Sequence, residues 1–282
     1  MKLAVCSGKG GTGKTTIAIA LAEVMGAPCT LVDCDVEEPN CHLVLGGEFS
    51  EEHPVMIAAP KVDETRCTGC GLCAKFCRFH ALVALGGLPL IFPELCHGCG
   101  GCIRVCPEKA MGERLRPIGS IGVLHSKKMA FIEGRLDVGE VAAPNVIRAA
   151  KERAKDNGSV VIDCPPGTAC ALVAAVQGCD FALIVAEPSP FGLHDMKLTA
   201  ESLRDMKIPH AVLLNRCMGN EFNGVSTYCL EQSIPLFGKI DYDSEVYRKC
   251  GGGSTLLAAA PELKKVFINI CSKIAEQVGG LK

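Results

Sequence analysis

The sequence predicts an α/β fold in which a mostly parallel sheet carries helices on both faces and is interrupted by a small inserted module. Short apolar runs alternate with segments of helical periodicity, which is the pattern of parallel strands joined by crossover helices. Residues 59–117 leave that alternation and contain two runs of cysteine among glycines. We therefore expect one domain formed by residues 1–58 and 118–282, and a second formed by residues 59–117.

The expected strands and helices follow one another along the first domain. Apolar runs of four or five residues predict strands at Lys2–Cys6, Cys29–Asp33, Val160–Asp163, Phe181–Val185 and His210–Leu214. Apolar residues at helical spacing predict helices near Thr15–Met25, Pro144–Lys155, Ala169–Val176, Gly192–Met206 and Pro261–Val278. Apolar and polar residues do not alternate in these short runs, which is typical of strands that are buried on both faces.

Composition narrows the classes of function and location. Lys and Arg number 29 and Asp and Glu 31, so the formal charge is −2 and a basic nucleic-acid-binding surface is not expected. The first residues lack the apolar stretch of a secretion signal, and the longest uncharged stretch, Cys164–Cys179, is shorter than the roughly 18 residues of a membrane span. A cytoplasmic protein without a transmembrane segment is expected. Its 19 cysteines then indicate metal binding or packing, because cytosolic thiols stay reduced.

The loop after the first expected strand has the sequence GKGGTGKTT, which matches the phosphate-binding pattern G-x-x-x-x-G-K-[ST]. An apolar strand precedes it and a helix follows, as that motif requires. Lys14 is expected to reach the β- and γ-phosphates, and the Thr15 hydroxyl to ligate Mg²⁺. The residues predicted to bind the nucleotide here are Gly8, Lys9, Gly10, Gly11, Thr12, Gly13, Lys14, Thr15 and Thr16.

The extra lysine of this loop, Lys9, resembles the deviant Walker A motif of the MinD, ParA, Mrp and nitrogenase iron protein superfamily. That resemblance implies a P-loop NTPase of the SIMIBI class, ATP as the nucleotide, and a homodimer closed across it. In that family the extra lysine contacts the nucleotide bound by the other subunit. A cation supplied in this way stabilises charge on the transferred phosphoryl group, so hydrolysis depends on assembly.

Three more segments resemble the same family. In Val32–Asn40, the likeness to the first switch implies that Asp35 positions or activates the attacking water. In Val160–Thr168, which resembles the Walker B strand and second switch, Asp163 is expected to hold water on Mg²⁺, since a carboxylate is costly at the end of a buried strand unless it is paired. Asn215 and Arg216 resemble the adenine-binding segment, and a carboxamide offers the adenine edge both a donor and an acceptor.

The cysteine runs form an internal repeat with the spacing C-x2-C-x2-C-x3-C, offset by 29 residues. This is the bacterial ferredoxin pattern, in which three close cysteines bind one 4Fe–4S cluster and the fourth ligates the other. The insert is therefore expected to be an α+β ferredoxin-like module with two clusters; zinc knuckles or structural thiols are the alternative. The first cluster would have as ligands Cys67, Cys70, Cys73 and Cys106, and the second would have Cys96, Cys99, Cys102 and Cys77. Cys170, seven residues after Asp163, is either a packing residue or a ligand shared across a dimer.

The combination of a MinD/Mrp-type ATPase with an inserted two-cluster module resembles the ferredoxin-containing ATPases encoded with the orange-protein complex of anaerobic bacteria. It implies ATP hydrolysis coupled to electron transfer to or from a partner metalloprotein. The alternatives are an ATPase that assembles or delivers iron–sulfur or metal clusters and, less favoured, a positioning ATPase like MinD. The expected partners are a second copy or a paralogous ATPase, and a redox or small metal-binding protein.

Overall fold

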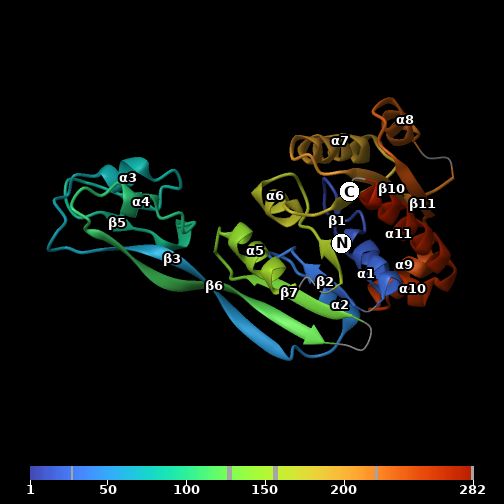
Figure 1. The fold of residues 1–282 in the computed structure, drawn as a ribbon, viewed down its shortest axis with the longest axis horizontal. Coiled ribbons are helices and arrows are strands. Elements are labelled where there is room, and N and C mark those ends of the chain that lie inside the picture. Colours follow the sequence, from blue (N-terminus) through green and yellow to red (C-terminus); the bar gives the residue numbers. More distant parts are fainter. Residues whose placement is uncertain (27, 126–128, 155–157, 220–221, 281–282) are drawn as a thin grey trace.

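The computed structural model describes residues 1–26, 28–125, 129–154, 158–219 and 222–280. Within them a nine-stranded sheet has the order β11-β10-β9-β1-β8-β2-β7-β6-β3 (Figure 1). Neighbours from β11 to β7 are parallel, and β6 and β3 are antiparallel additions at one edge. The strands are β1 (Lys2–Cys6), β2 (Cys29–Asp33), β3 (Glu51–Val62), β6 (Met111–His125), β7 (Ala130–Leu136), β8 (Ser159–Asp163), β9 (Phe181–Ala186), β10 (His210–Cys217) and β11 (Leu236–Asp241), while β4 (Leu82–Val83) and β5 (Leu90–Ile91) pair separately.

Helices cover both faces of the parallel part of the sheet, as the sequence predicts. Alternate residues of β1 separate the two core layers: Ala4 and Cys6 face one, and Leu3 and Val5 the other. The first layer is completed by α5 (Ala143–Arg153), α6 (Cys170–Val176), α7 (Pro190–Asp205) and α8 (Gly224–Glu231). The second layer includes α1 (Lys14–Met25), α10 (Leu256–Ala259) and α11 (Lys264–Gly279), with α2 (Cys41–Leu45) and α9 (Ser244–Gly251) at its margin.

All five expected strands and all five expected helices are present, and their bounds differ by a few residues. Residues 261–263 form a 3-10 turn, η2 (Pro261–Leu263), so α11 begins at Lys264. Helix α7 begins earlier than expected because the Ser189 hydroxyl caps it by accepting the Gly192 N–H at 3.0 Å. The expected end of the helix near residue 155 lies outside the described residues.

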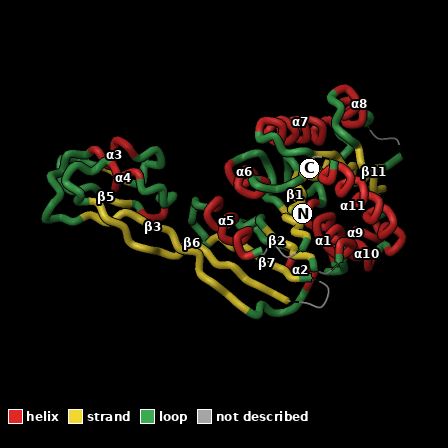
Figure 2. The backbone as a smooth tube through the Cα atoms, in the orientation of Figure 1, coloured by secondary structure: helices red, strands yellow, loops and turns green. Residues whose placement is uncertain are grey.

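A long two-stranded arm is the feature that the sequence did not predict. Strands β3 and β6 pair over most of their length, and Figures 1 and 2 show them leaving the body of the molecule as one ribbon. The ribbon carries residues 63–110 at its far end, which we call the tip; it holds α3 (Leu72–Phe76), α4 (Gly101–Arg104) and η1 (Pro93–Leu95). Residues 59 and 117, the expected domain limits, lie inside these two strands.

Prolines within the two strands of the arm interrupt the sequence pattern that indicates a strand. Pro54 and Pro60 lie in β3, which is an edge strand and tolerates residues without an N–H. Pro117 lies in β6, where the register shifts between Val55 and Met56 of the partner strand, so the irregularity accommodates the missing donor. Among the described residues, no helix combines the length and the apolar character needed to cross a membrane.

Candidate functional site

The loop expected to bind phosphate joins the central strand β1 to the N-terminus of α1, which is the strand–loop–helix context that the sequence predicts. Gly11 and Gly13 have φ values of 79° and 95°, a conformation that other residues rarely adopt, and a Cβ on Gly13 would lie 2.5 Å from the Asn215 amide nitrogen. Lys14 is buried. The Thr12 hydroxyl oxygen is also buried, without a hydrogen-bond partner in the described part of the chain. A helix N-terminus beside a buried cation and an unpaired hydroxyl fits a phosphate group.

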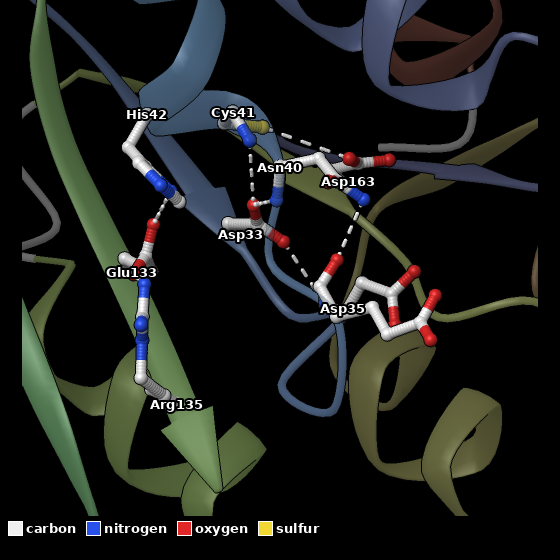
Figure 3. Close-up of polar contacts among 9 residues, drawn as sticks. Asp33, Asp35, Asn40, Cys41, His42, Glu133, Arg135 and Asp163 are labelled. Atoms are coloured by element: carbon white, nitrogen blue, oxygen red, sulfur yellow. Dashed lines mark hydrogen bonds and ion pairs between the residues drawn. The ribbon is translucent and has the colours of Figure 1, made fainter. Parts of the chain in front are cut away.

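Three buried carboxyl groups lie in register on adjacent strands, and two of them, Asp33 and Asp163, are the last residues of their strands. Asp33 of β2 is level with Asp163 of β8 on one side and with Glu133 of β7 on the other. Asp33 accepts hydrogen bonds from the backbone N–H groups of Asp35, Asn40 and Cys41, each at 3.0 Å (Figure 3). These bonds fold the loop after β2 around one carboxylate, so Asp33 determines the shape of the segment that carries Asp35.

Asp163 is suited to holding a cation or its water. Its Oδ1 atom is buried without a hydrogen-bond partner among the described residues, and its Oδ2 atom accepts the Cys41 S–H at 3.6 Å. Burial raises the pKa of Asp163 to about 8, and the charge of Asp33 adds to the effect. A positive ion at this point would favour the ionised form. Asp35 is half-buried, and burial together with Asp33 raises its pKa to about 6.

The first residues of α2 connect this carboxylate row to the base of the arm, a connection that sequence reasoning missed. Cys41 contacts Asp163 as described, and the next residue, His42, places its Nδ1 atom 2.6 Å from Glu133 (Figure 3). Glu133 also forms an ion pair with Arg135 at 2.8 Å, both on β7. Strand β7 pairs with β6, a strand of the arm. No sequence motif marks Glu133, because its partner comes from a distant segment.

Asn215, which is expected from the sequence to bind adenine, lies beside the phosphate loop. Its amide donates to the Thr12 carbonyl oxygen at 2.7 Å, and its side-chain oxygen accepts the Tyr247 hydroxyl at 3.2 Å. Asn215 and Tyr247 line a cavity of about 350 Å³ together with Gly13 and Thr16. That volume lies at the lower end of the roughly 300–1,000 Å³ of small-molecule sites. Tyr247, from α9, was not predicted.

Lys9 and Arg216 share one carboxylate, again a contact that the sequence did not reveal. Lys9 Nζ lies 2.7 Å from one oxygen of Glu187, and Arg216 donates to the other at 2.8 Å. The Arg216 guanidinium lies over the Tyr247 ring, 5.2 Å from its centroid, and does not line the cavity. Glu187 follows β9, so sheet order brings it to the phosphate loop.

The eight repeated cysteines line two separate cavities in the tip. The first is lined by Cys67, Cys70, Cys73 and Cys106, and the second by Cys77, Cys96, Cys99 and Cys102. These are the two sets expected from the sequence. Gly69, Gly71, Gly98 and Gly100 have φ values near 70°, which lets the backbone turn tightly around the thiols. The backbone N–H of Gly98 donates to the Cys96 sulfur at 3.4 Å, and the backbone N–H of Ala110 donates to the Cys106 sulfur at 3.3 Å.

The second cavity lies nearer the body than the first. Ala58 and Pro60 of β3 line it, and a Cβ on Gly98 would lie within 4 Å of Asn145, a residue of α5. Arg116 of β6 ties the same side of the tip to the body, donating to Glu140 at 2.7 Å and to the Pro93 carbonyl oxygen. Cys170 is exposed at the start of α6 and lines neither cavity.

Comparison with known proteins gives concordant matches. A family model described as the CobQ/CobB/MinD/ParA nucleotide binding domain matches residues 3–256. An uncharacterized protein of Methanocaldococcus jannaschii is 32% identical over 252 residues, covering 87% of this chain and 86% of that protein. An iron–sulfur cluster carrier protein of Pyrococcus abyssi is 23% identical, with 100% of this chain and 88% of the carrier covered.

Solved structures resemble the chain in fold. The septum site-determining protein MinD of Pyrococcus horikoshii, in complex with Mg-ADP, has a TM-score of 0.59 at 19% identity, covering 99% of this chain and 97% of that one. A ParA family ATPase of Chlorobium tepidum also reaches 0.59, at 14% identity, covering 95% and 96%. At these identities the likeness concerns the fold alone.

Proposed function

The chain belongs to the CobQ/CobB/MinD/ParA nucleotide-binding family, and we propose that it is an ATP-hydrolysing iron–sulfur protein whose nucleotide state controls electron transfer to or from a partner metalloprotein. One observation carries this proposal. Two quartets of thiols surround two cavities at the end of an arm whose strands belong to the same sheet as the nucleotide site.

The proposed nucleotide chemistry assigns a task to each group around the phosphate loop. Residues 8–16 bind the phosphates, with Lys14 on the β- and γ-phosphates and Thr15 as a ligand of Mg²⁺. Asp163 would hold a water on that ion, and Asp35 would position or activate the attacking water. The unpaired oxygens of Thr12 and Asp163 support this assignment, since buried polar atoms otherwise have partners. Asn215 would bind the adenine, Arg216 would contribute to that site through the Tyr247 ring on which it packs, and Lys9 would complete the site of the partner subunit in a homodimer.

The proposed module, residues 59–117, would hold one 4Fe–4S cluster in each cysteine cavity. The donor set fits, because such clusters take four thiolates each and are tuned by N–H groups directed at sulfur. When bound, the clusters supply one-electron redox chemistry. This chain's own residues contribute the thiols and a short antiparallel pair, β4 and β5, while Met111 packs with Cys73 and Cys102 in the small core of the tip.

Coupling between the two sites would run through the base of the arm. The loop after β2 is shaped by Asp33, and α2 follows it with Cys41 on Asp163 and His42 on Glu133. Glu133 lies on β7, which pairs with β6. A nucleotide that reshapes the loop would therefore act on a strand that extends directly to the cysteine cavities.

Iron and acid-labile sulfide analysis of protein purified anaerobically tests the cluster assignment. About eight of each per chain supports two 4Fe–4S clusters. Zinc in place of iron would overturn the assignment in favour of structural metal sites. ATP turnover by the same preparation, with Lys14→Ala as the inactive control, tests the hydrolase assignment.

Nucleotide control is tested by measuring the midpoint potentials of the clusters with and without a non-hydrolysable ATP analogue and Mg²⁺. We expect the potentials to shift in the wild-type protein and to stay constant in Lys14→Ala, which lacks the phosphate contact. Equal potentials with and without the analogue in the wild-type protein would contradict nucleotide-gated electron transfer.

Cluster delivery is the second candidate, and the iron–sulfur cluster carriers of Pyrococcus that span the whole chain favour it. Against it, four thiols around each cavity leave no open coordination position, whereas a delivered cluster must be labile. Incubation of the cluster-loaded protein with ATP and an apo-ferredoxin distinguishes the two. Iron transferred in proportion to ATP hydrolysed supports delivery, and iron retained on this chain supports electron transfer. A positioning ATPase would instead bind lipid vesicles or DNA in an ATP-dependent way.

A further inference from the structure

A ring of contacts begins and ends on the phosphate loop. Thr12 accepts from Asn215, which accepts from Tyr247. The Tyr247 ring packs under Arg216, Arg216 pairs with Glu187, and Glu187 pairs with Lys9 of the same loop. The ring therefore joins the cavity proposed for the adenine to the lysine proposed to act across a dimer interface.

Glu187 holds Lys9 on its own subunit. The Lys9 ammonium lies 2.7 Å from the carboxylate, and the two side chains are 34% and 18% exposed. An ammonium engaged in this way is not available to a phosphate on another chain until the pair separates. When Lys9 leaves Glu187, the Glu187 carboxylate is not left unpaired, because Arg216 still pairs with its other oxygen. The arrangement is therefore suited to an exchange of partners by Lys9.

The adenine cavity is placed to influence that exchange. A base that binds Asn215 must share the amide and carbonyl groups that Thr12 and Tyr247 now use. Any displacement of Tyr247 moves the ring on which Arg216 packs, and Arg216 is the second partner of Glu187. Occupancy of the cavity would thereby change the charge environment of the carboxylate that retains Lys9.

We propose that Glu187 is a positioning residue, which retains Lys9 on its own subunit and releases it to the partner subunit's nucleotide when ATP fills the site. This inference rests on the proposed ATP-dependent homodimer and adds its regulation. Because the Lys9–Glu187 ion pair is partly exposed, its loss should change the equilibrium between retained and released Lys9 by about two- to fivefold. A symmetric dimer releases two such lysines, so the dimer dissociation constant should change by about four- to 25-fold.

The Glu187→Gln variant tests the proposal, because it removes the charge and keeps the shape of the side chain. We expect its dimer dissociation constant, measured with a non-hydrolysable ATP analogue, to fall by about four- to 25-fold relative to wild type. Glu201→Gln, a change of an exposed carboxylate on α7, is the matched control and should leave the constant unchanged. In a Lys9→Ala background Glu187→Gln should have no further effect, because the proposed role acts through Lys9.

A second measurement reads the contact without any dimer. Labelling of nucleotide-free protein with an amine-reactive reagent, followed by mass spectrometry, gives the rate at Lys9 relative to exposed Lys265. Glu187→Gln should raise that ratio by about two- to fivefold. An unchanged labelling ratio, or a wild-type protein that dimerises as tightly as Glu187→Gln, would overturn the proposed role of Glu187 and leave the proposed dimer standing. A wild-type protein that never dimerises with the analogue would overturn the proposed dimer, whatever the labelling result.

Discussion

The body of the molecule and the tip of its arm are stabilised in different ways. The body has central strands buried on both faces and two extensive core layers. In the tip, helices α3 and α4 have five and four residues, the paired strands have two each, and the buried core consists of Cys73, Leu82 and Cys102, against which Met111 of β6 packs. Helices this short are unstable alone, and so small a core rarely stabilises a fold.

The tip also exposes many large apolar side chains, whereas the body buries most of its own. Those of the tip that are more than a third exposed are Leu72, Phe76, Phe79, Leu85, Leu88, Leu90, Phe92 and Leu95. The proposed clusters would supply stability that the tip lacks, because metal-binding energy becomes folding energy in small modules. The body needs no such support. The two regions should consequently respond to different changes.

Loss of one exposed thiolate should have the largest effect, and it should be confined to the tip. Cys70 is exposed and adds little packing, so Cys70→Ser tests the metal and not the core. We expect iron to fall from about eight to about four or fewer per chain, and residues 63–110 to lose protection from amide exchange. Helix α1 should keep its protection. A tip that stays protected without iron would show that it folds without metal.

Lys14→Ala should have the converse effect, because it should lower ATP turnover in the body and leave the tip unchanged. Removing one charged contact from a reacting phosphate lowers turnover by about 10²- to 10³-fold. ATP turnover at saturating Mg²⁺ measures this loss. Iron content should stay at the wild-type value, and a simultaneous loss of iron would mean that the two regions do not fold independently.

The pH dependence of turnover should identify Asp35 in the body. Burial raises the pKa of Asp35 to about 6, and the ionised form is the one that can orient water. The value of kcat/KM reports the free enzyme, so below pH 6 it should fall more steeply, by a further factor of about ten per pH unit, than between pH 6 and 8, where Asp163 with its pKa of about 8 still titrates. Asp35→Asn should lower kcat/KM at pH 7 and remove the additional fall below pH 6. A wild-type profile that is flat between pH 5 and 7 would exclude Asp35 as that group.

Arg116→Ala should loosen the joint between the two regions. Arg116 and Glu140 are 14% and 13% exposed, so their pair is poorly screened and its loss should cost about 1–3 kcal/mol. Amide exchange should accelerate around Pro93, whose carbonyl oxygen Arg116 binds. Arg153→Ala, at an exposed site at the end of α5, is the matched control. Identical exchange in both variants would mean that Arg116 does not fix the tip.

Cys170→Ser should have the smallest effect. Cys170 lines neither cavity, and we expect unchanged iron and turnover within about twofold. Loss of about four iron atoms per dimer would instead make Cys170 a ligand shared between subunits.

Contiguous segments were predictable, and contacts between segments were not. The expected strands coincide with β1 and β2 because apolar runs buried on both faces have sharp ends. The phosphate loop was predictable because it depends on spacing within a short stretch, and the thiol sets were predictable because the ferredoxin pattern assigns the fourth cysteine of each run to the other set. Strands β3 and β6 were missed because their prolines are tolerated only at an edge and beside a register shift. Glu133, Glu187 and Tyr247 were missed because no motif surrounds them.

The sequence by itself determined the fold class, the phosphate loop, the positions of the expected strands along the chain and the division of the eight cysteines into two sets. Short-range stereochemistry and repeat spacing are sufficient for these. Tertiary structure alone decided that β9 lies beside β1, which brings Glu187 to Lys9, and that β7 lies beside β2, which brings Glu133 level with Asp33. Strand order results from the packing of helices on both faces of a whole sheet, so no local segment encodes it.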